Sequence, residues 1–267
     1  MARIAGEGPD ILEAGQGPLV VLVHSSVSGA RQWHRLIDRL APRFHVKAVN
    51  LYGYGGTPPW TGGRPERLED QADLVARALN GTRGPISLIG HSLGGSIAMK
   101  AALRLGSRIG RLALLEPNAF FLLRDAGRHA AYGEVLALRR VVLEQGARDG
   151  DWPGAAAYFA DYWGGLGTWE ATSPKRRAAF IEALKPNVHE WDAVLGERTP
   201  LESYAADLPA DTLVLHDPAT VRPIREIVAL LQAHTPWRFE TLPEGGHMAP
   251  LTHPDVVNPV LEQFLIE

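Results

Sequence analysis

Residues 90–94 read Gly-His-Ser-Leu-Gly and lie between an apolar run at 86–90 and an alanine-rich stretch at 96–103. The first run is typical of a buried strand and the second of a helix, so the serine is predicted to occupy the turn between them. Such a sharp turn brings the backbone on either side into close contact, which only glycine permits. The serine hydroxyl would then project from the turn, and Leu93 N–H, at the helix N-terminus, would donate to an oxyanion. The pattern therefore predicts that Ser92 is a nucleophile.

Short β-branched runs alternate with helical patterns along much of the chain, which is typical of a mainly parallel sheet flanked by helices. The predicted strands are 18–24, 45–50, 86–90, 111–115, 212–216 and 237–241. Beside the helix that follows the serine turn, helices are predicted at 68–79, 223–233 and 254–266. The sequence therefore predicts an α/β protein.

The stretch from about 120 to 207 differs from its surroundings. It is rich in Ala, Arg and Glu with helical periodicity and contains no convincing strand. We therefore expect a helical lid at 120–207, inserted into a core domain made of 1–119 and 208–267. Its aromatic residues are expected either to wall an apolar acyl pocket or to pack the lid against the core: Trp152, Tyr158, Phe159, Tyr162, Trp163 and Trp169.

Composition and motifs exclude several classes of function. The chain has no cysteine, which rules out disulfides, thiolate metal sites and a cysteine nucleophile. Its formal net charge is -3 and the charges are interspersed, so neither nucleic acid nor an anionic membrane is an expected partner. Zinc-protease, dinucleotide and P-loop motifs are absent, and we expect neither a metal nor a cofactor. The expected partner is a small uncharged substrate, and the sequence leaves the oligomeric state open.

The N-terminal segment argues against export. It carries Glu7, Asp10 and Glu13 where a signal peptide needs a basic start and an uninterrupted apolar run. Apolar stretches such as 19–23 are far shorter than the roughly 20 residues that span a bilayer. We therefore expect a soluble, cytoplasmic protein.

With these motifs the chain resembles the α/β-hydrolase family over nearly its whole length, least closely in the lid. Residues 23–26, Val-His-Ser-Ser, are similar to the family's strand and His-Gly-x oxyanion loop, with Ser25 where glycine is usual. By this match Ser26 N–H would be the second oxyanion donor, beside Leu93 N–H. Residues 50–57 resemble the family's Asp-x-x-Gly-x-Gly-x-Ser loop, with Asn50 in place of aspartate and an expected architectural role.

The resemblance also implies a catalytic histidine. Residues 246–248, Gly-His-Met, follow the last predicted strand, where the family places that residue. Because an imidazole titrates near neutrality, His247 is suited to accept the serine proton and to return it to the leaving group. We interpret His24, His91 and His253 as packing or hydrogen-bonding residues.

The third member of the implied Ser-His-acid triad has two candidates. The family's acid most often follows the strand at 212–216, where its usual spacing falls on Thr220, which carries no charge. Either Asp217 substitutes or the acid comes from elsewhere. Some family members carry it at the end of the preceding sheet strand, a place held here by Glu116. We favour Glu116, because a carboxylate ending an apolar strand is costly to bury without a partner such as histidine.

The resemblance implies a hydrolase that cleaves a carboxylic ester, thioester or lactone of a small, largely apolar substrate through an acyl-enzyme on Ser92. The same triad would also serve carbon–carbon bond hydrolysis, hydroxynitrile lyase or cofactor-free perhydrolase chemistry. Polar lid residues that would face Ser92 in such reactions include His129, Arg139, Arg140 and His189. A ligand receptor that keeps the fold without turnover is a further alternative.

Overall fold

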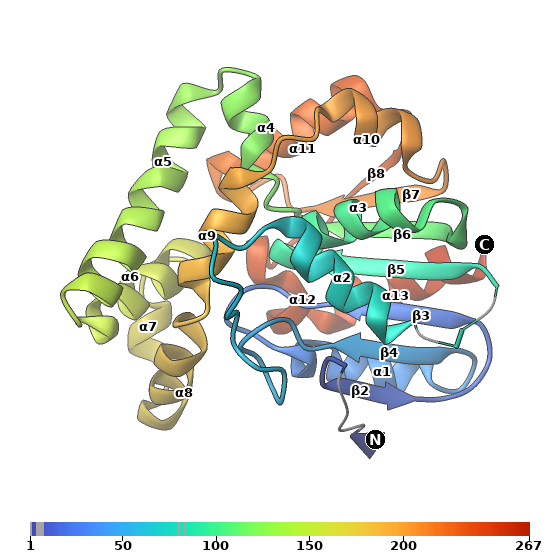
Figure 1. The fold of residues 1–267 in the computed structure, drawn as a ribbon, viewed down its shortest axis with the longest axis horizontal. Coiled ribbons are helices and arrows are strands. Elements are labelled where there is room, and N and C mark those ends of the chain that lie inside the picture. The colour runs from blue at the N-terminus through green and yellow to red at the C-terminus, as the bar shows by residue number, and fades with distance from the viewer. Residues whose placement is uncertain (1, 4–7, 80, 83) are drawn as a thin grey trace.

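The computed structural model describes residues 2–3, 8–79, 81–82 and 84–267 of the protein. Across these ranges an eight-stranded sheet has the order β1-β2-β4-β3-β5-β6-β7-β8 (Figure 1). Its strands are β1 (Ala2–Arg3), β2 (Ile11–Ala14), β3 (Leu19–Val23), β4 (His45–Val49), β5 (Ile86–His91), β6 (Ile109–Leu115), β7 (Thr212–His216) and β8 (Arg238–Thr241). Strands β3 to β8 pair in parallel, whereas β1 and β2 join the edge beside β4 in antiparallel pairs. The predicted α/β class with a mainly parallel sheet is confirmed.

All six predicted strands are present, with ends that differ by at most two residues. The sequence prediction missed β1 and β2. Strand β2 has only four residues, and of these Ile11 alone is buried, so neither an alternating pattern nor an apolar run marks it.

Strand β3 shows why the centre of the sheet is strongly specified by the sequence. All five of its side chains are buried, and successive residues point to opposite faces because the side-chain period of a strand is two. Leu19 and Val21 join one hydrophobic core, and Val20 and Leu22 join the other. Each such Val or Leu contributes on the order of 2 kcal/mol by leaving water.

Helices cover both faces of this sheet. α2, α3 and α11 pack on the face of the first core, and α1 and α13 pack on the face of the second. The helices of the sheet domain are η1 (Ala30–Trp33), α1 (His34–Leu40), α2 (Leu68–Ala78), α3 (Leu93–Leu105), η2 (Gly106–Arg108), α11 (Arg222–His234), η4 (Gly246–Met248), α12 (Ala249–Thr252) and α13 (Pro254–Ile266).

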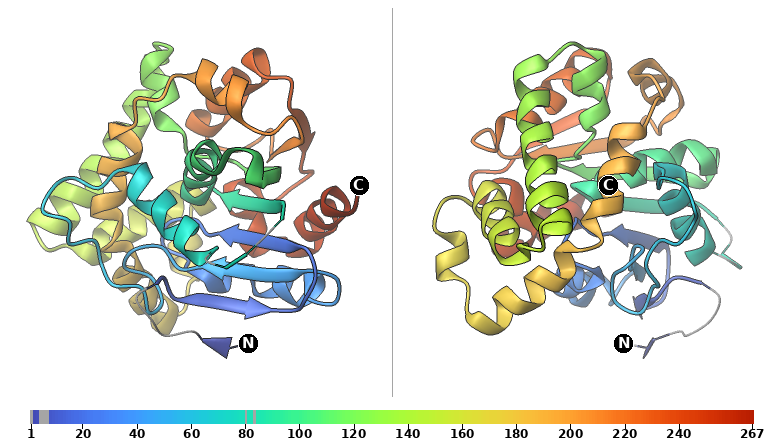
Figure 2. Two further views of the ribbon diagram at one scale, coloured as in Figure 1. Left: turned by 45° about the vertical axis from the view of Figure 1, so that its right-hand side comes forward. Right: turned by 60° about the vertical axis from the view of Figure 1, so that its left-hand side comes forward.

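Residues 120–207, which we call the helical insertion, form helices and connecting turns throughout. They are α4 (Phe120–Asp125), α5 (His129–Arg140), the π-helical η3 (Val141–Arg148), α6 (Trp152–Gly164), α7 (Thr168–Ala171), α8 (Pro174–Leu184), α9 (Asn187–Gly196) and α10 (Leu201–Asp207). Helices α5 to α9 of the insertion lie beyond the carboxyl ends of the parallel strands (Figures 1 and 2), whereas α10 packs beside α3 and α11 of the sheet domain. None of the helices in the described residues combines the length and the hydropathy that a membrane-spanning helix requires.

Candidate active site

The turn that carries Ser92 joins β5 to α3 and has the geometry expected from its glycines. Ser92 has a φ of 55°, in the left-handed region that non-glycine residues rarely adopt. A Cβ atom on Gly90 would collide with the carbonyl oxygen of Gly94, and one on Gly94 would collide with that of Val23. Larger residues at these two positions would therefore open the turn and displace the serine.

Backbone hydrogen bonds hold Ser92 in this conformation. Its N–H donates to the carbonyl oxygen of Leu115 at 2.9 Å, and its own carbonyl oxygen accepts from Gly95 N–H at 2.9 Å and Asn118 N–H at 3.1 Å. The serine is thus fixed both to its own helix and to the end of the neighbouring strand β6.

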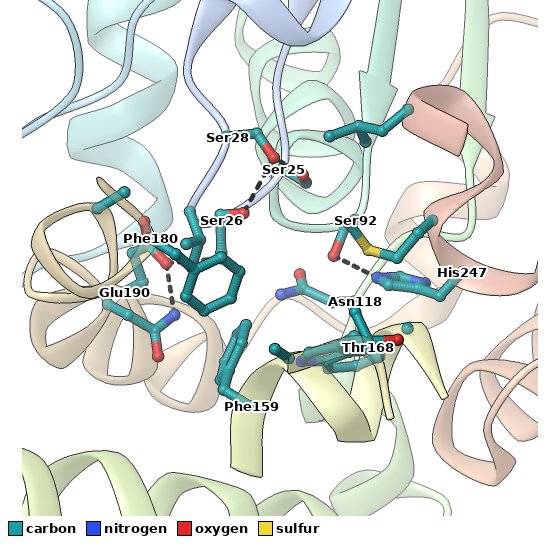
Figure 3. Close-up of a pocket in the computed structure, with 18 of the residues that line it drawn as sticks. Ser25, Ser26, Ser28, Ser92, Asn118, Phe159, Thr168, Phe180, Glu190 and His247 are labelled. Atoms are coloured by element: carbon teal, nitrogen blue, oxygen red, sulfur yellow. Dashed lines mark hydrogen bonds between the residues drawn. The ribbon is translucent and has the colours of Figure 1, made fainter. Parts of the chain in front are cut away.

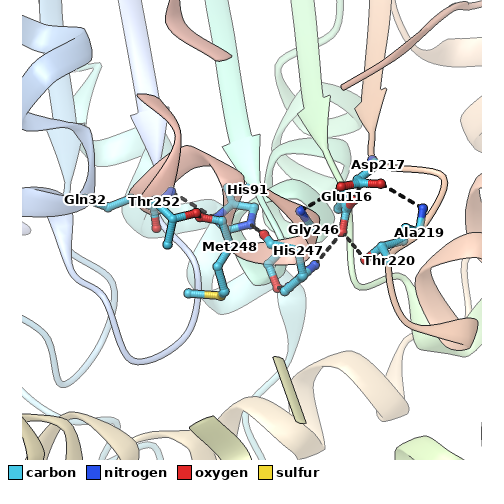
Figure 4. A network of polar contacts seen from close by, with 11 residues as sticks. Gln32, His91, Glu116, Asp217, Ala219, Thr220, Gly246, His247, Met248 and Thr252 are labelled. Carbon is cyan, nitrogen blue, oxygen red and sulfur yellow. Dashed lines mark hydrogen bonds and ion pairs between the residues drawn. The ribbon is translucent and has the colours of Figure 1, made fainter. Parts of the chain in front are cut away.

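His247, in the turn after β8, lies between Ser92 and Glu116. Its Nε2 is 2.9 Å from Ser92 Oγ, and its Nδ1 is 2.8 Å from Glu116 Oε2 (Figures 3 and 4). All three residues are buried. Because Nδ1–H donates to the carboxylate, Nε2 is left to accept the serine proton. The structure therefore brings together the serine, histidine and favoured acid of the sequence prediction.

Glu116 follows the last residue of β6 and, like Ser92, has a positive φ, of 44°. Its Oε1 accepts Asp217 N–H at 2.8 Å, and its Oε2 accepts the Thr220 hydroxyl at 2.7 Å in addition to His247. Thr220, at the position where the resemblance would place the acid, therefore donates a hydrogen bond to Glu116. These donors stabilise the ionised carboxylate and fix its direction.

Asp217, the alternative acid, bonds backbone groups instead of the imidazole. Its Oδ1 accepts Ala219 N–H at 2.7 Å and its Oδ2 accepts Gly246 N–H at 2.8 Å (Figure 4). It therefore stabilises its own loop and the turn that carries His247.

The loop after β3 carries the predicted oxyanion donor. Ser25 N–H donates to Gln32 Oε1 at 3.0 Å, and Val27 N–H donates to the Tyr54 hydroxyl at 2.9 Å. Within the described residues, the N–H groups of Ser26 and Leu93 donate to no protein group. These two are the amides that the sequence indicates for an oxyanion hole, and their hydrogen-bonding capacity is free.

His24 supports this loop in its neutral form. Its Nδ1–H donates to the carbonyl oxygen of Ser25 at 2.7 Å, and its Nε2 accepts Leu51 N–H at 3.1 Å. Burial lowers the pKa of His24 to about 4. An uncharged ring with one donor and one acceptor fits both contacts at neutral pH.

His91 supports the backbone of His247 in the same way. Its Nε2–H donates to the carbonyl oxygen of His247 at 2.8 Å, and its Nδ1 accepts from Gln32 Nε2 at 3.0 Å. Burial, followed by the nearby His247, holds the pKa of His91 well below its usual value. His24 and His91 are therefore hydrogen-bonding residues that would remain neutral during catalysis.

Asn50 organises the loop at 50–57, as expected for an architectural residue. Its Oδ1 accepts Ala30 N–H at 2.8 Å, and its Nδ2 donates to Asp10 Oδ2 at 2.9 Å. Asp10 Oδ2 also accepts Gly56 N–H at 2.7 Å. Asp10, which precedes β2, thus supplies the carboxylate that this loop lacks at position 50.

A cavity of about 530 Å³ lies in front of Ser92 and His247, walled largely by the helical insertion (Figure 3). Its apolar wall includes Phe120, Phe159, Trp163, Phe180, Trp191 and Val194. The Trp163 ring lies 4.2 Å from the His247 ring, centroid to centroid. Polar side chains at another part of the lining come from Ser26, Asn187 and Glu190.

The sequence predicted this wall only in part. Of the six aromatic residues singled out, Phe159 and Trp163 line the cavity. Trp152, Tyr162 and Trp169 pack against the core, and Tyr158 is exposed. The polar candidates His129, Arg139, Arg140 and His189 do not line it; the insertion contributes Arg176, Asn187 and Glu190 instead.

Local sequence carries no signal that Arg176, Asn187 and Glu190 line a cavity, because only the packing of the insertion brings them there. Glu190, for example, bonds residues 136 and 164 positions away along the chain.

The sequence model of a family described as the alpha/beta hydrolase family matches residues 20–260 of the chain. Lipase LipV of Mycobacterium tuberculosis is 35% identical over 106 residues, which cover 38% of either chain. A pimeloyl-[acyl-carrier protein] methyl ester esterase of Aeromonas hydrophila is 34% identical over 111 residues, 42% of either chain. The matched stretch thus spans about two fifths of these curated relatives. The crystal structure of a hydrolase from Pseudomonas aeruginosa, 24% identical, shares the fold with a TM-score of 0.74 over 99% of this chain and 97% of that one.

Proposed function

The chain belongs to the alpha/beta hydrolase family, and on this premise we propose that it hydrolyses a carboxylic ester, thioester or lactone through an acyl-enzyme on Ser92. The observation that carries the proposal is His247, hydrogen-bonded to Ser92 Oγ on one side and to Glu116 on the other, at the floor of an apolar cavity. The partner is a small, largely apolar molecule, because a cavity of about 530 Å³ has the size of a small-molecule site.

In the acylation step Ser92 Oγ attacks the carbonyl carbon while its proton moves to His247 Nε2. The N–H groups of Ser26 and Leu93 donate to the resulting oxyanion. Glu116 stabilises the imidazolium through Nδ1–H. When the tetrahedral intermediate collapses, the bond to the leaving group breaks and Nε2–H protonates the departing alcohol or thiol, which leaves an acyl-serine.

In the deacylation step the same groups act on water. His247 Nε2 takes a proton from a water molecule, whose oxygen attacks the acyl carbon under the same two amides. Collapse returns the proton to Ser92 Oγ and releases the carboxylic acid. The helical insertion acts as a lid that excludes bulk water and selects the acyl or leaving group by the shape of its aromatic wall.

A fluorophosphonate probe tests the nucleophile directly, because it reacts with an activated serine and leaves an adduct that peptide mapping locates. We expect labelling of Ser92 in the folded protein and none in Ser92→Ala. Turnover of p-nitrophenyl esters of increasing acyl length then gives the reaction class and the pocket size.

Two results would contradict the proposal. Folded wild-type protein that is neither labelled nor active on any ester would indicate a ligand-binding role. Faster turnover of diketones or cyanohydrins than of esters would assign the triad to a different reaction.

A further inference from the structure

Glu190, in α9 of the helical insertion, has a carboxylate that no step of the proposed mechanism uses. The residue is 3% exposed and lies in the cavity lining (Figure 3). Its carboxylate accepts hydrogen bonds from Ser26 Oγ, the Tyr54 hydroxyl and Asn187 Nδ2, each at 2.6 Å. Burial raises the pKa of Glu190, and the three donors oppose that rise. Two of these donors belong to the sheet domain, so the carboxylate joins the insertion to the loops around the nucleophile.

Through these two donors Glu190 holds two successive residues of the loop after β3. It holds Ser26 by the side-chain hydroxyl. It holds Val27 indirectly, because the Tyr54 hydroxyl that donates to Glu190 also accepts Val27 N–H at 2.9 Å.

Val27 needs such support more than most residues would. Its φ is 65°, in the left-handed region that a β-branched residue seldom adopts. A strained backbone of this kind persists only where the surrounding contacts fix it. The Tyr54 hydroxyl provides one such contact, and Glu190 fixes the position of that hydroxyl.

An independent contact shows that the insertion is seated directly on the loop that carries Tyr54. Gly53 has a φ of 82°, and a Cβ atom there would come within 2.7 Å of Pro186 Cγ. Pro186 is the residue before α9. Backbone of the sheet domain and side chain of the insertion are therefore in close contact one residue from Tyr54 and four residues from Glu190.

We propose that Glu190 is a positioning residue for the oxyanion hole: by holding Ser26 and, through Tyr54, Val27, it keeps Ser26 N–H directed at the developing oxyanion. The inference rests on the proposed function. With this role for Glu190, the insertion contributes to stabilisation of the transition state as well as to the shape of the cavity. Movement of the insertion away from the sheet domain would then disassemble the oxyanion hole.

The test compares Glu190→Ala with Glu197→Ala in the full chain. Glu197 is a matched control, because it is also a buried carboxylate of the insertion, directly after α9, but bonds Lys100 and Thr199, away from the oxyanion loop. Loss of a whole oxyanion donor costs on the order of 10²- to 10³-fold in kcat. For Glu190→Ala we expect about 10- to 100-fold lower kcat on a short neutral ester, with KM changed less than about 3-fold, because the amide is loosened and not removed.

Affinity for a trifluoromethyl ketone separates positioning from general loss of structure. The ketone forms a tetrahedral oxyanion on the serine, so its affinity should fall in parallel with kcat/KM in Glu190→Ala and stay unchanged in Glu197→Ala. Ser26→Ala keeps the N–H and removes only the link to Glu190, and Tyr54→Phe removes the link to Val27. Both should lower kcat and ketone affinity in the same direction, and they serve as the test where Glu190→Ala does not fold.

Glu190→Gln keeps one acceptor oxygen and should recover part of the kcat lost in Glu190→Ala. A folded Glu190→Ala variant with kcat and ketone affinity within about 3-fold of wild type would overturn the inference. So would a loss of kcat and ketone affinity in Glu197→Ala equal to that in Glu190→Ala. Neither result would contradict the proposed function. A wild-type protein that turns over no ester would refute the proposed function, and this inference would fall with it.

Discussion

The hydrogen-bond network around His247 at the edge of the sheet and the polar atoms of the cavity wall built by the insertion differ in how far they are satisfied. At the sheet edge Ser92, His247 and Glu116 bond one another, and Asp217 and Thr220 complete the network. In the wall, within the part of the chain that the structure describes, Trp163 Nε1, Trp191 Nε1 and Asn187 Oδ1 are buried without a hydrogen-bond partner.

The difference reflects how each region is built. Parallel strands end side by side, so the short loops that follow them bring polar residues into fixed contact. Helices of the insertion pack mainly through apolar side chains, so several polar atoms of the wall, such as the indole Nε1 atoms of Trp163 and Trp191, have no matching partner. Under the proposed function, the sheet edge therefore preorganises the chemistry and the shape of the wall selects the substrate. Glu190 joins the two regions through the hydrogen bonds that it accepts from Ser26 and Tyr54.

The largest effect is expected from breaking the sheet-edge network at its acid. Glu116→Gln should lower kcat on the order of 10³- to 10⁴-fold, because an amide neither stabilises the imidazolium nor fixes its tautomer. Asp217→Asn should lower kcat less than about 10-fold, because its contacts are to backbone N–H groups and one amide oxygen remains to accept. Steady-state kinetics of both variants on one ester decide which carboxylate is the acid, and circular dichroism checks that both variants are folded. A large loss in Asp217→Asn alone would transfer the acid to Asp217.

The buried neutral histidines of the sheet edge should make stability depend on pH. The folded-state pKa of His24 is lowered to about 4, below the usual 6.5, so below pH 6.5 the unfolded chain binds a proton that the folded chain does not. The stabilisation is complete above pH 6.5 and is lost as the pH falls towards 4, by up to about 3 kcal/mol. Urea unfolding of wild type and His24→Asn from pH 7 to 4 measures this loss, which the variant should lack. His253→Asn is the control, and an identical slope in all three proteins would refute the prediction.

An exchange of residues within the network tests the role of Thr220. Because its hydroxyl lies 2.7 Å from Glu116 Oε2, Thr220→Asp in a Glu116→Gln background should return a carboxylate to the neighbourhood of His247 and raise kcat about 10-fold over Glu116→Gln alone. In the wild-type background the same change sets two carboxylates side by side and should reduce activity. A double variant no faster than Glu116→Gln would show that position 220 cannot serve the imidazole.

The smallest effect on the chemical step is expected in the cavity wall. Trp163→Ala should shift the relative kcat/KM for long over short acyl esters by about 10-fold, because it removes aromatic wall beside His247 and enlarges the cavity. Trp169→Ala, on the same insertion but outside the lining, should leave that preference unchanged. An acyl-length series measures both. A loss in Trp163→Ala that is equal for all esters would mean that this ring acts on His247 and not on selectivity.

Much of the sheet edge was predictable because its signals are local. Strands β3, β5, β6 and β7 are largely apolar and buried, and the glycines flanking Ser92 mark a turn whose crowding is a short-range property. Glu116 was preferred from its place at the end of an apolar strand, and the structure sets it 2.8 Å from His247. The actual role of Thr220 was not foreseen, since a threonine in the usual acid position gives no indication of what its hydroxyl bonds.

The cavity wall was predictable only in outline. Helical periodicity indicated the helices of 120–207, but a period of 3.6 residues does not say which apolar face meets the core and which meets the cavity. Trp169 and Trp163 carry the same local signal, yet only Trp163 lines the cavity.

The sequence by itself determined the main strands of the sheet, the turn around Ser92, and which polar residues follow the strands at their carboxyl ends. It could do so because strand pattern and glycine sterics act between near neighbours in the chain. The tertiary structure alone decided that His247 turns to Glu116 and not to Asp217, and that Glu190 reaches Ser26 from 164 residues away. Such contacts depend on the directions of whole elements, which are set by the packing of the sheet and the insertion against each other.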